Sequence, residues 1–400
     1  MNKYQEIRVR VAQKFLRPFL LETETLIHRK LNGSKIIWLE KDTHFNLEQT
    51  GDLFVDGHFR RWFGRHEVKG QVLFCLTDAY LVSRWSIPIT KNGHILLETS
   101  GRFGMLVQNL TIRNPGVVLP EYRLLFFLVV LKLSRLIRVK LWTSRKSYAS
   151  IFHLVPRHGN TPGEPAFSHW IFENLPLLRV FNRALEFDST VKLFVGGVLK
   201  EWQSITLDLM RVKKKEILVS HHDFIVPVEK LYIGRLPFIH TNEIRFDPIG
   251  RTWINNVMRA TLMSKYDTNI NPFKKIALSR RYCSRRRLLD EDKFQDQLIQ
   301  RGFKILYPEK ISEIDKVIYS FNAEVILGLP SGSALANFIF ADKPHVIEIL
   351  PKESLISVWF LLSRELDIKY SLVMASSVGS QADFREHNYA LDPKDLITIL

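Results

Sequence analysis

The stretch AEVILGLPSGSALANFIF, residues 323–340, joins an apolar strand to a helix of small residues through a turn of Gly, Pro and Ser. Unpaired backbone N–H groups and the positive end of the helix dipole make such a helix start suitable for binding phosphate. Ligands of open α/β sheets bind at the carboxyl ends of strands, where this turn lies. The turn is neither GxGxxG nor a Walker sequence, so a purely geometric use of Gly and Ser is the alternative.

Strands and helices alternate on both sides of this turn. This regular alternation predicts a doubly wound parallel sheet with right-handed crossovers. Ser312 is a candidate N-cap, and Asp392 before Pro393 marks the start of a terminal helix. We expect strands at 275–281, 303–308, 323–328, 345–350 and 369–374, and helices at 290–301, 312–321, 333–340, 354–366 and after 392.

An arginine cluster follows the first of these strands, in SRRYCSRRRLLDED at residues 279–292. Guanidinium groups bind phosphate oxygens through two parallel hydrogen bonds, so the cluster indicates an anion site. The alternative is a solvated basic loop paired with Asp290, Glu291 and Asp292. Strands one and three of such a sheet deliver their carboxyl ends to one crevice, so we expect Arg280 and the 331–333 turn to face one diphosphate.

A second candidate site lies in HWIFENLPLLRVF, residues 169–181. His169 and Glu173 are four residues apart on a predicted helix and therefore share a face. A histidine held by a carboxylate suits a general base that deprotonates an acceptor hydroxyl. The same pair could ligate zinc, but no third ligand has a suitable spacing. A structural histidine beside Trp170 is the other alternative.

Two weaker candidates sit at other strand ends. Glu348, in VIEILP, is expected to end a strand facing the phosphate turn and to bind a ribose or sugar hydroxyl. The His221-His222-Asp223 turn follows the strand at 216–220 and is more typical of a polar turn than of a catalytic one.

Composition limits the class of protein. The chain has 400 residues, 57 Lys plus Arg against 41 Asp plus Glu, a net charge of +16 and 46% hydrophobic residues. This excludes a disordered tail and predicts two or three domains. The only cysteines, Cys75 and Cys283, exclude a disulfide framework and a thiolate metal cluster, and a reducing compartment fits them best. No secretion signal is expected, because no long apolar stretch follows the basic start.

The strongest apolar run, residues 124–131, is too short to span a bilayer. The basic amphipathic segment behind it makes 124–140 a possible contact with anionic lipid, although a core element with a solvated basic edge is the commoner case.

The sequence before residue 275 predicts a different arrangement of helices and strands from that of the last third. An opening helix is expected at 7–31, and residues 1–150 are otherwise strand-rich, with a hairpin signal at Asn92-Gly93. Residues 151–265 alternate between helices (167–185, 202–212, 252–263) and strands (192–197, 216–220), which predicts a parallel lobe. A polar segment at 266–272 separates this lobe from the one at 266–400.

Taken together, the segments SRRYCSRRRLLDEDKF, GFKILYPEKIS, AEVILGLPSGSALANFIF, VIEILP and HWIFENLPLLRVF resemble the family 61 glycosyltransferases, the capsular polysaccharide and plant xylosyltransferase type. The resemblance covers roughly residues 167–400. It implies a GT-B fold of two Rossmann-like lobes facing a cleft, a nucleotide-sugar donor, inverting transfer and no required metal.

Carried over by position, the resemblance gives Arg280 and Arg286 the role of basic residues near the diphosphate, together with Gly332. The family's His-Gly-Ala-Gly turn is replaced here by Pro330-Ser331-Gly332-Ser333, so Ser331 or Ser333 would substitute for the missing histidine. Asn337 matches the Asn that follows the small residues and is expected to orient the turn or bind the donor.

The predicted protein is therefore a cytoplasmic glycosyltransferase, free or peripheral to the inner face of a membrane, that builds a surface or capsular polysaccharide. It uses no cofactor, takes a nucleotide diphosphate sugar, with UDP favoured, and transfers the sugar to a glycan. The alternatives are a basic nucleic-acid-binding protein, which lacks RRM, KH and helix-turn-helix signatures, and a degenerate transferase-fold scaffold subunit.

Overall fold

The fold of the protein is given by a computed structural model. The helix predicted at residues 7–31 is wrong at Leu20–Leu21, because these two residues form a strand, β1. The rest of that helix, the 124–140 segment, the 221–223 turn, Ser331, Gly332 and nearly all of the terminal helix lie outside the described residues. The structure describes residues 20–21, 34–82, 87–96, 147–154, 167–220, 225–235, 246–268, 273–284, 286–328, 333–352, 358–379, 387–392 and 394–395.

The chain divides into two compact units, and neither is one continuous segment. Unit 1 comprises residues 1–43, 69–200 and 212–245, and unit 2 comprises residues 44–68, 201–211 and 246–400. Both carry parallel strands, so the fold is of mixed α/β type, as predicted.

The sheet of unit 1 combines a mostly antiparallel part from the first hundred residues, in which only β1 and β7 are parallel among the described strands, with a parallel part from the next hundred and fifty. Its order is β1-β7-β6-β5-β11-β8-β9-β10, with β2 also pairing with β5. Parallel pairs run from β11 through β8 and β9 to β10, whereas β5 is antiparallel to β11. The strands not yet delimited are β2 (Ser34–Trp38), β5 (Val72–Val82), β6 (Ile87–Ile89), β7 (Ile95–Leu96), β8 (Tyr148–Leu154), β9 (Lys192–Gly196), β10 (Ile217–Ser220) and β11 (Ile225–Gly234).

The hairpin predicted at Asn92-Gly93 is confirmed. Antiparallel strands β6 and β7 flank it, and Gly93 has a φ of 77°, which favours glycine. The expected parallel strands are also present, but β1, β2 and β5 to β7 from the N-terminal region belong to the same sheet as these strands. Because β5 pairs along its length with β11, the strand-rich N-terminal region and the predicted lobe share one sheet.

A continuous helical segment of unit 1 covers the predicted helix at 167–185. It changes type along its length: α6 (Phe167–His169), a π-helix η4 (Trp170–Asn174), a 3-10 turn η5 (Leu175–Leu177) and α7 (Leu178–Phe187). Leu177 and Val180 pack closely over Gly234 of β11, which seats the segment on the sheet.

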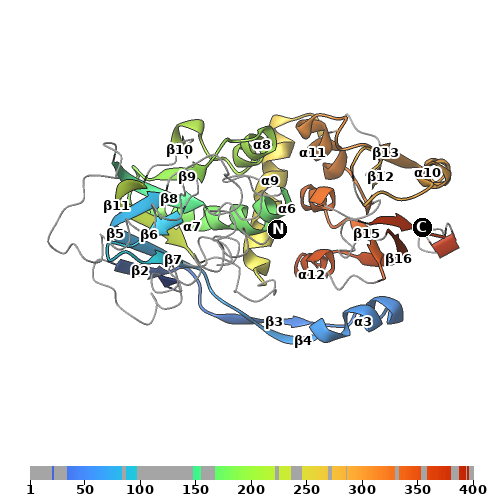
Figure 1. Ribbon diagram of the computed structural model, residues 1–400, viewed down its shortest axis with the longest axis horizontal. Helices are drawn as coiled ribbons and strands as arrows, with labels where there is room; N and C mark the ends of the chain where they lie inside the picture. Colours follow the sequence, from blue (N-terminus) through green and yellow to red (C-terminus); the bar gives the residue numbers. More distant parts are fainter. Residues whose placement is uncertain are drawn as a thin grey trace, which may run out of the picture. The chain divides into compact units, whose positions relative to one another are not determined.

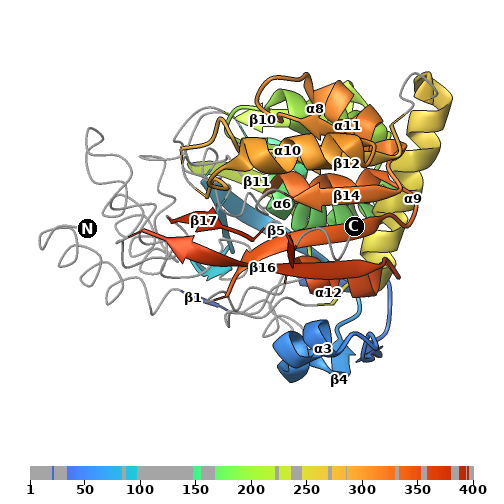
Figure 2. The ribbon, with the colours of Figure 1, turned by 90° about the vertical axis from the view of Figure 1, so that its right-hand side faces the viewer.

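Unit 2 contains the predicted doubly wound sheet. Its order is β13-β12-β14-β15-β16-β17, parallel except for the last strand. Figure 2 shows β12, β14 and β16 in this sequence across the sheet. The strands are β12 (Lys275–Leu278), β13 (Phe303–Leu306), β14 (Val325–Gly328), β15 (His345–Pro351), β16 (Tyr370–Val378) and β17 (Asn388–Ala390).

Helices cover both faces of this sheet. On one face, Phe294 and Leu298 of α10 join the core formed by Leu327, Ile347 and Val373. On the other face, Phe360 of α12 meets Tyr370. The helices of the unit are α8 (Glu201–Leu209), α9 (Pro248–Lys265), α10 (Glu291–Gln300), α11 (Glu313–Phe321), the 3-10 helix η8 (Ser333–Phe340) and α12 (Val358–Glu365). Ser312 caps α11 as predicted, accepting a hydrogen bond from the Asp315 amide.

An arm from the N-terminal region, residues 44–68, belongs to unit 2 (Figure 1). It consists of β3 (Thr43–Leu47), α3 (Leu53–Phe59), the 3-10 turn η2 (Arg60–Trp62) and β4 (Gly64–Val68). Within unit 2, the Phe45 ring stacks on Phe246 at 5.0 Å and the Phe59 ring on Phe360 at 4.2 Å. Buried aromatic contacts therefore hold the arm in a core that is distant from it in sequence.

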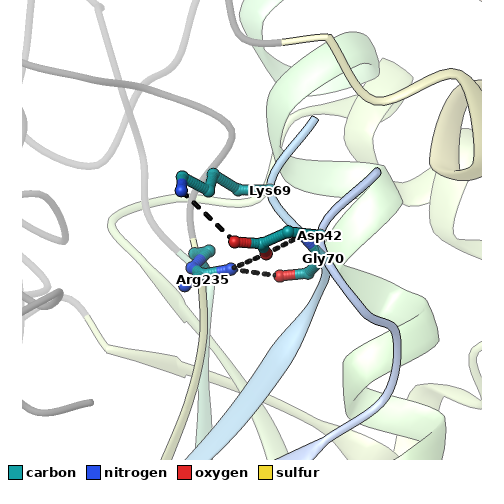
Figure 3. A network of polar contacts seen from close by, with 4 residues as sticks. All are labelled: Asp42, Lys69, Gly70 and Arg235. Atoms are coloured by element: carbon teal, nitrogen blue, oxygen red, sulfur yellow. Dashed lines mark hydrogen bonds and ion pairs between the residues drawn. The ribbon is translucent and has the colours of Figure 1, made fainter. Parts of the chain in front are cut away.

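The two ends of the arm are joined in unit 1 by a polar network (Figure 3). Asp42 accepts hydrogen bonds from the Gly70 amide at 2.8 Å and from Lys69 and Arg235. Arg235 also donates to the Gly70 carbonyl at 2.6 Å. Burial acts to raise the pKa of Asp42, but these hydrogen bonds and charges lower it overall. The carboxylate is therefore the form that holds the base of the arm together.

The domain boundaries differ from those predicted. The second boundary falls at residue 245/246 and not at 265/266, because α9 packs within unit 2. Its buried Arg251 contacts Glu365 of α12, and Glu365 also accepts from the Asp247 amide at 2.8 Å. The helix α8 likewise belongs to unit 2, since its Asp208 pairs with Lys265 at 2.6 Å.

Candidate active site

The carboxyl edge of the unit 2 sheet joins two of the segments singled out in the sequence. The strand order places β12 between β13 and β14, so the chain leaves in opposite directions on the two sides of β12. Such a switch point is where open α/β sheets bind ligands. Leu278 is aligned with Gly328, so the arginine segment and the Gly-Pro-Ser turn follow neighbouring strand ends.

The arginine segment is tied to the far edge of the sheet through β17. The Arg286 amide donates to the His387 carbonyl at 3.1 Å, and the Tyr389 amide donates to the Arg287 carbonyl at 2.8 Å. Residues 286–289 thus run alongside β17 as a parallel addition to it. This pairing fixes the backbone from which Arg286 projects.

The arginines differ in exposure, which sequence alone did not separate. Arg280 and Arg286 are half-buried, whereas Arg281 and Arg287 are exposed. Arg280 donates from Nε to the Arg286 carbonyl at 3.2 Å, and Arg281 pairs with Asp292. The Arg280 guanidinium is therefore tied to the backbone of Arg286 across the loop, while Arg281 pairs with a carboxylate on the surface. Arg285 lies outside the described residues.

A buried polar network supports this loop, and little in the sequence indicated it. Under the alternative of a solvated basic loop, Glu291 would pair with the arginines, but its side chain is buried and accepts from the Ser279 hydroxyl and from Gln295 Nε2 at 2.8 Å. Burial raises the pKa of Glu291, and the two hydrogen bonds partly offset this effect. Gln295 in turn accepts from the Tyr307 hydroxyl at 2.8 Å. The i,i+4 spacing of Glu291 and Gln295 was the available signal.

The phosphate turn itself is described only at its end. Ser333 is the first residue of η8, which is a 3-10 helix and not the predicted α-helix. Asn337, one turn later, is buried and donates to the Ala334 carbonyl at 2.6 Å. The role of Asn337 in orienting the turn or binding the donor stays a prediction. Donor binding by Ser331, Gly332 and Ser333 stays a prediction.

Glu348 does not end its strand, as the sequence interpretation assumed. It is the fourth residue of β15, which continues to Pro351, and it is 1% exposed. The Tyr370 hydroxyl donates to it at 2.7 Å, and burial together with the Glu348 charge raises the pKa of Tyr370 well above its usual value. In the structure, Glu348 therefore forms a buried hydrogen bond between neighbouring strands. Its contact with the donor stays a prediction.

In unit 1, His169 and Glu173 come together as their spacing predicted. The His169 Nδ1 contacts a Glu173 carboxylate oxygen, at the junction between α6 and the π-helix η4. The His169 side chain is 34% exposed and that of Glu173 is 7% exposed. Asn174 Nδ2 donates to the His169 carbonyl at 3.3 Å. π-Helical turns occur often at functional sites, and in this one the backbone hydrogen bonds join residues five apart instead of four.

The chemistry of this pair follows from its geometry. An ionised carboxylate only accepts hydrogen bonds, so Glu173 selects the tautomer with the proton on Nδ1 of His169. The basic lone pair then lies on Nε2. A partly exposed imidazole, oriented by a buried carboxylate, is an arrangement that can take a proton from a hydroxyl group. Among the described residues, no group of three His, Cys, Asp or Glu side chains is arranged to hold a metal ion.

Parallel strands in both units, an arginine segment that follows a strand at a switch point and a histidine-carboxylate pair are consistent with an α/β transferase. Residues 167–347 match the family model described as Glycosyltransferase 61, which confirms the resemblance seen in the sequence and supports a glycosyltransferase. The match includes His169, Glu173, Arg280 and Arg286 and ends just before Glu348. No curated protein matches the chain.

In the described part of the chain, no helix combines the length and apolar character needed to cross a bilayer.

Proposed function

We propose that this glycosyltransferase moves a sugar from a nucleotide diphosphate sugar to the hydroxyl of a glycan acceptor, with inversion at the anomeric carbon and without a required metal. The observation that carries the proposal is the alignment of Leu278 with Gly328. It supports a diphosphate site in which Arg280 and Arg286 act from one strand end and the 331–333 turn acts from the next.

His169 is the proposed general base. Its Nε2 removes the proton from the acceptor hydroxyl as the oxygen attacks the anomeric carbon, and the bond from that carbon to the diphosphate breaks in the same displacement. Glu173 stabilises the imidazolium that forms, because its carboxylate contacts Nδ1. A single in-line displacement of this kind inverts the anomeric configuration.

The proposed diphosphate site acts on the leaving group. Negative charge develops on the diphosphate as the glycosidic bond breaks, and fixed cations stabilise that charge more in the transition state than in the ground state. The link from Arg280 to the Arg286 carbonyl supports this role, because a guanidinium held in place needs little reorganisation during the reaction.

The remaining parts of the proposal rest on the family. We propose a GT-B arrangement in which unit 1 carries the acceptor side and unit 2 the donor side, and UDP-sugars as the first donors to test. The proposed role is surface or capsular polysaccharide synthesis, in the cytoplasm or at the inner face of a membrane. No cofactor is required.

A thermal-shift screen with UDP-, GDP-, CMP- and dTDP-sugars tests the proposal. A true donor is expected to raise the melting temperature, since a ligand that binds only the folded state stabilises it. Hydrolysis of that donor, measured next, separates an active enzyme from a degenerate scaffold.

Two results would contradict the proposal. One is the absence of a shift with every donor. The other is submicromolar binding to random duplex DNA at about 150 mM salt, where nonspecific phosphate contacts are weak. The second would favour the nucleic-acid-binding alternative.

A further inference from the structure

An exposed tyrosine lies in the turn that follows β12. Tyr282 is 53% exposed, although its neighbours in space hold the ring on two sides. The Tyr307 ring meets it at 5.3 Å and an angle of 66°, and the Lys310 ammonium lies 4.6 Å from its centroid. A half-exposed aromatic ring beside a cationic group is suited to a planar aromatic ligand.

The turn around Tyr282 is held firmly. The Cys283 amide donates to the Arg280 carbonyl at 2.9 Å, which closes a turn with Arg281 and Tyr282 at its centre. The Arg281 amide donates to Ser279 Oγ at 3.1 Å. Cys283 Sγ donates to Glu309 at 3.0 Å, and burial together with this carboxylate raises the pKa of the thiol to about 11, so the donor proton is retained.

The side chains on both sides of Tyr282 are thus tied back to the protein, and its own ring points into contact with Tyr307 and Lys310. Tyr307 is itself fixed through Gln295 to the buried Glu291. A ring presented on such a support loses little conformational freedom when it binds a ligand. It also lies two residues beyond Arg280, on the same strand end as the proposed diphosphate site.

We propose that Tyr282 is the residue on which the nucleobase of the donor stacks, with Tyr307 as a positioning residue that holds its ring. This inference rests on the proposed function, because it needs the diphosphate near Arg280. The ribose then spans from the diphosphate to the base. Stacking on a ring tolerates different bases, so Tyr282 provides affinity for a nucleoside diphosphate as a class, and base identity is set elsewhere.

The test compares two probes by isothermal titration calorimetry on the full-length protein: a nucleoside diphosphate, UDP first and then GDP, CDP and dTDP, and inorganic pyrophosphate, which has no base. Tyr282→Ala is expected to weaken nucleoside diphosphate binding about 5- to 150-fold. It should leave pyrophosphate binding within about twofold, because no phosphate contact is removed. Tyr282→Phe should keep the affinity for both.

Phe54→Ala is the matched control, since Phe54 is an aromatic residue of the same unit with 54% exposure. It should change neither affinity, and the melting temperatures of all variants should agree. Equal loss of both probes in Tyr282→Ala, or no loss of nucleoside diphosphate binding, would overturn the stacking role. A rise in acceptor KM alone would assign the ring to the glycan and also overturn it. If the unchanged protein binds neither probe, the proposed function fails as well.

Discussion

Acidification is expected to destabilise unit 2 through His345, the first residue of β15. Its Nε2 contacts Ser371 Oγ at 2.8 Å on the neighbouring strand. Burial, together with the charge of Lys369, lowers the pKa of His345 from 6.5 to about 4. At neutral pH the imidazole is therefore neutral in both the folded and the unfolded chain.

The sign follows from the protons bound by each state. Between pH 6.5 and 4 the unfolded chain binds a proton at His345 that the folded protein does not, so the free energy of unfolding falls as the pH is lowered. The difference between the two pKa values lowers the free energy of unfolding by about 3.4 kcal/mol below pH 4 and by about 2 kcal/mol at pH 5. This loss is a large fraction of the stability of an ordinary domain.

His345→Gln removes the titration and keeps an amide that can hydrogen-bond Ser371. We expect its free energy of urea unfolding to fall less than that of the unchanged protein between pH 7 and 5, by about 2 kcal/mol. All other carboxylates and histidines are common to both proteins and cancel in the comparison. The same pH dependence in both proteins, or an imidazole NMR titration of His345 near pH 6.5, would refute the reasoning.

Four further substitutions test the site and the arm. His169→Ala is expected to lower turnover about 100- to 10,000-fold at saturating donor, while donor affinity stays nearly constant. Glu173→Gln should also lower turnover without changing donor affinity. Near-normal turnover in His169→Ala would make His169 a packing residue. Arg280→Ala should weaken donor binding by about 1.5–3 kcal/mol, through loss of a charge-assisted contact, and unchanged donor affinity in titration calorimetry would exclude it from the diphosphate site. Gly70→Ala should lower the free energy of unfolding by about 1–3 kcal/mol, because a Cβ there would lie 2.2 Å from the Glu40 carbonyl oxygen. An unchanged urea midpoint would show that the backbone at the two ends of the arm can shift without cost.

The sequence by itself determined the features that depend on neighbours in the chain. The doubly wound sheet of unit 2, the Ser312 cap, the Asn92-Gly93 hairpin and the His169–Glu173 pair were all predicted correctly. Each rests on a short-range rule, such as periodicity, capping or i,i+4 spacing, that the sequence displays directly. The sequence also placed the carboxyl ends of the first and third strands, β12 and β14, at one edge of the sheet, and the structure pairs these two strands directly.

Only the tertiary structure decided which distant segments pair and which side chains become buried. The arm at 44–68 joins unit 2 through Phe45 and Phe59, and β5 joins the parallel strands of unit 1 through β11. Strand and aromatic partners separated by more than a hundred residues leave no periodic pattern, since any apolar strand or ring can satisfy the same local rules. For the same reason the sequence could not distinguish buried Glu291 from exposed Asp292, because their fates depend on the packing around Ser279 and the position of Arg281.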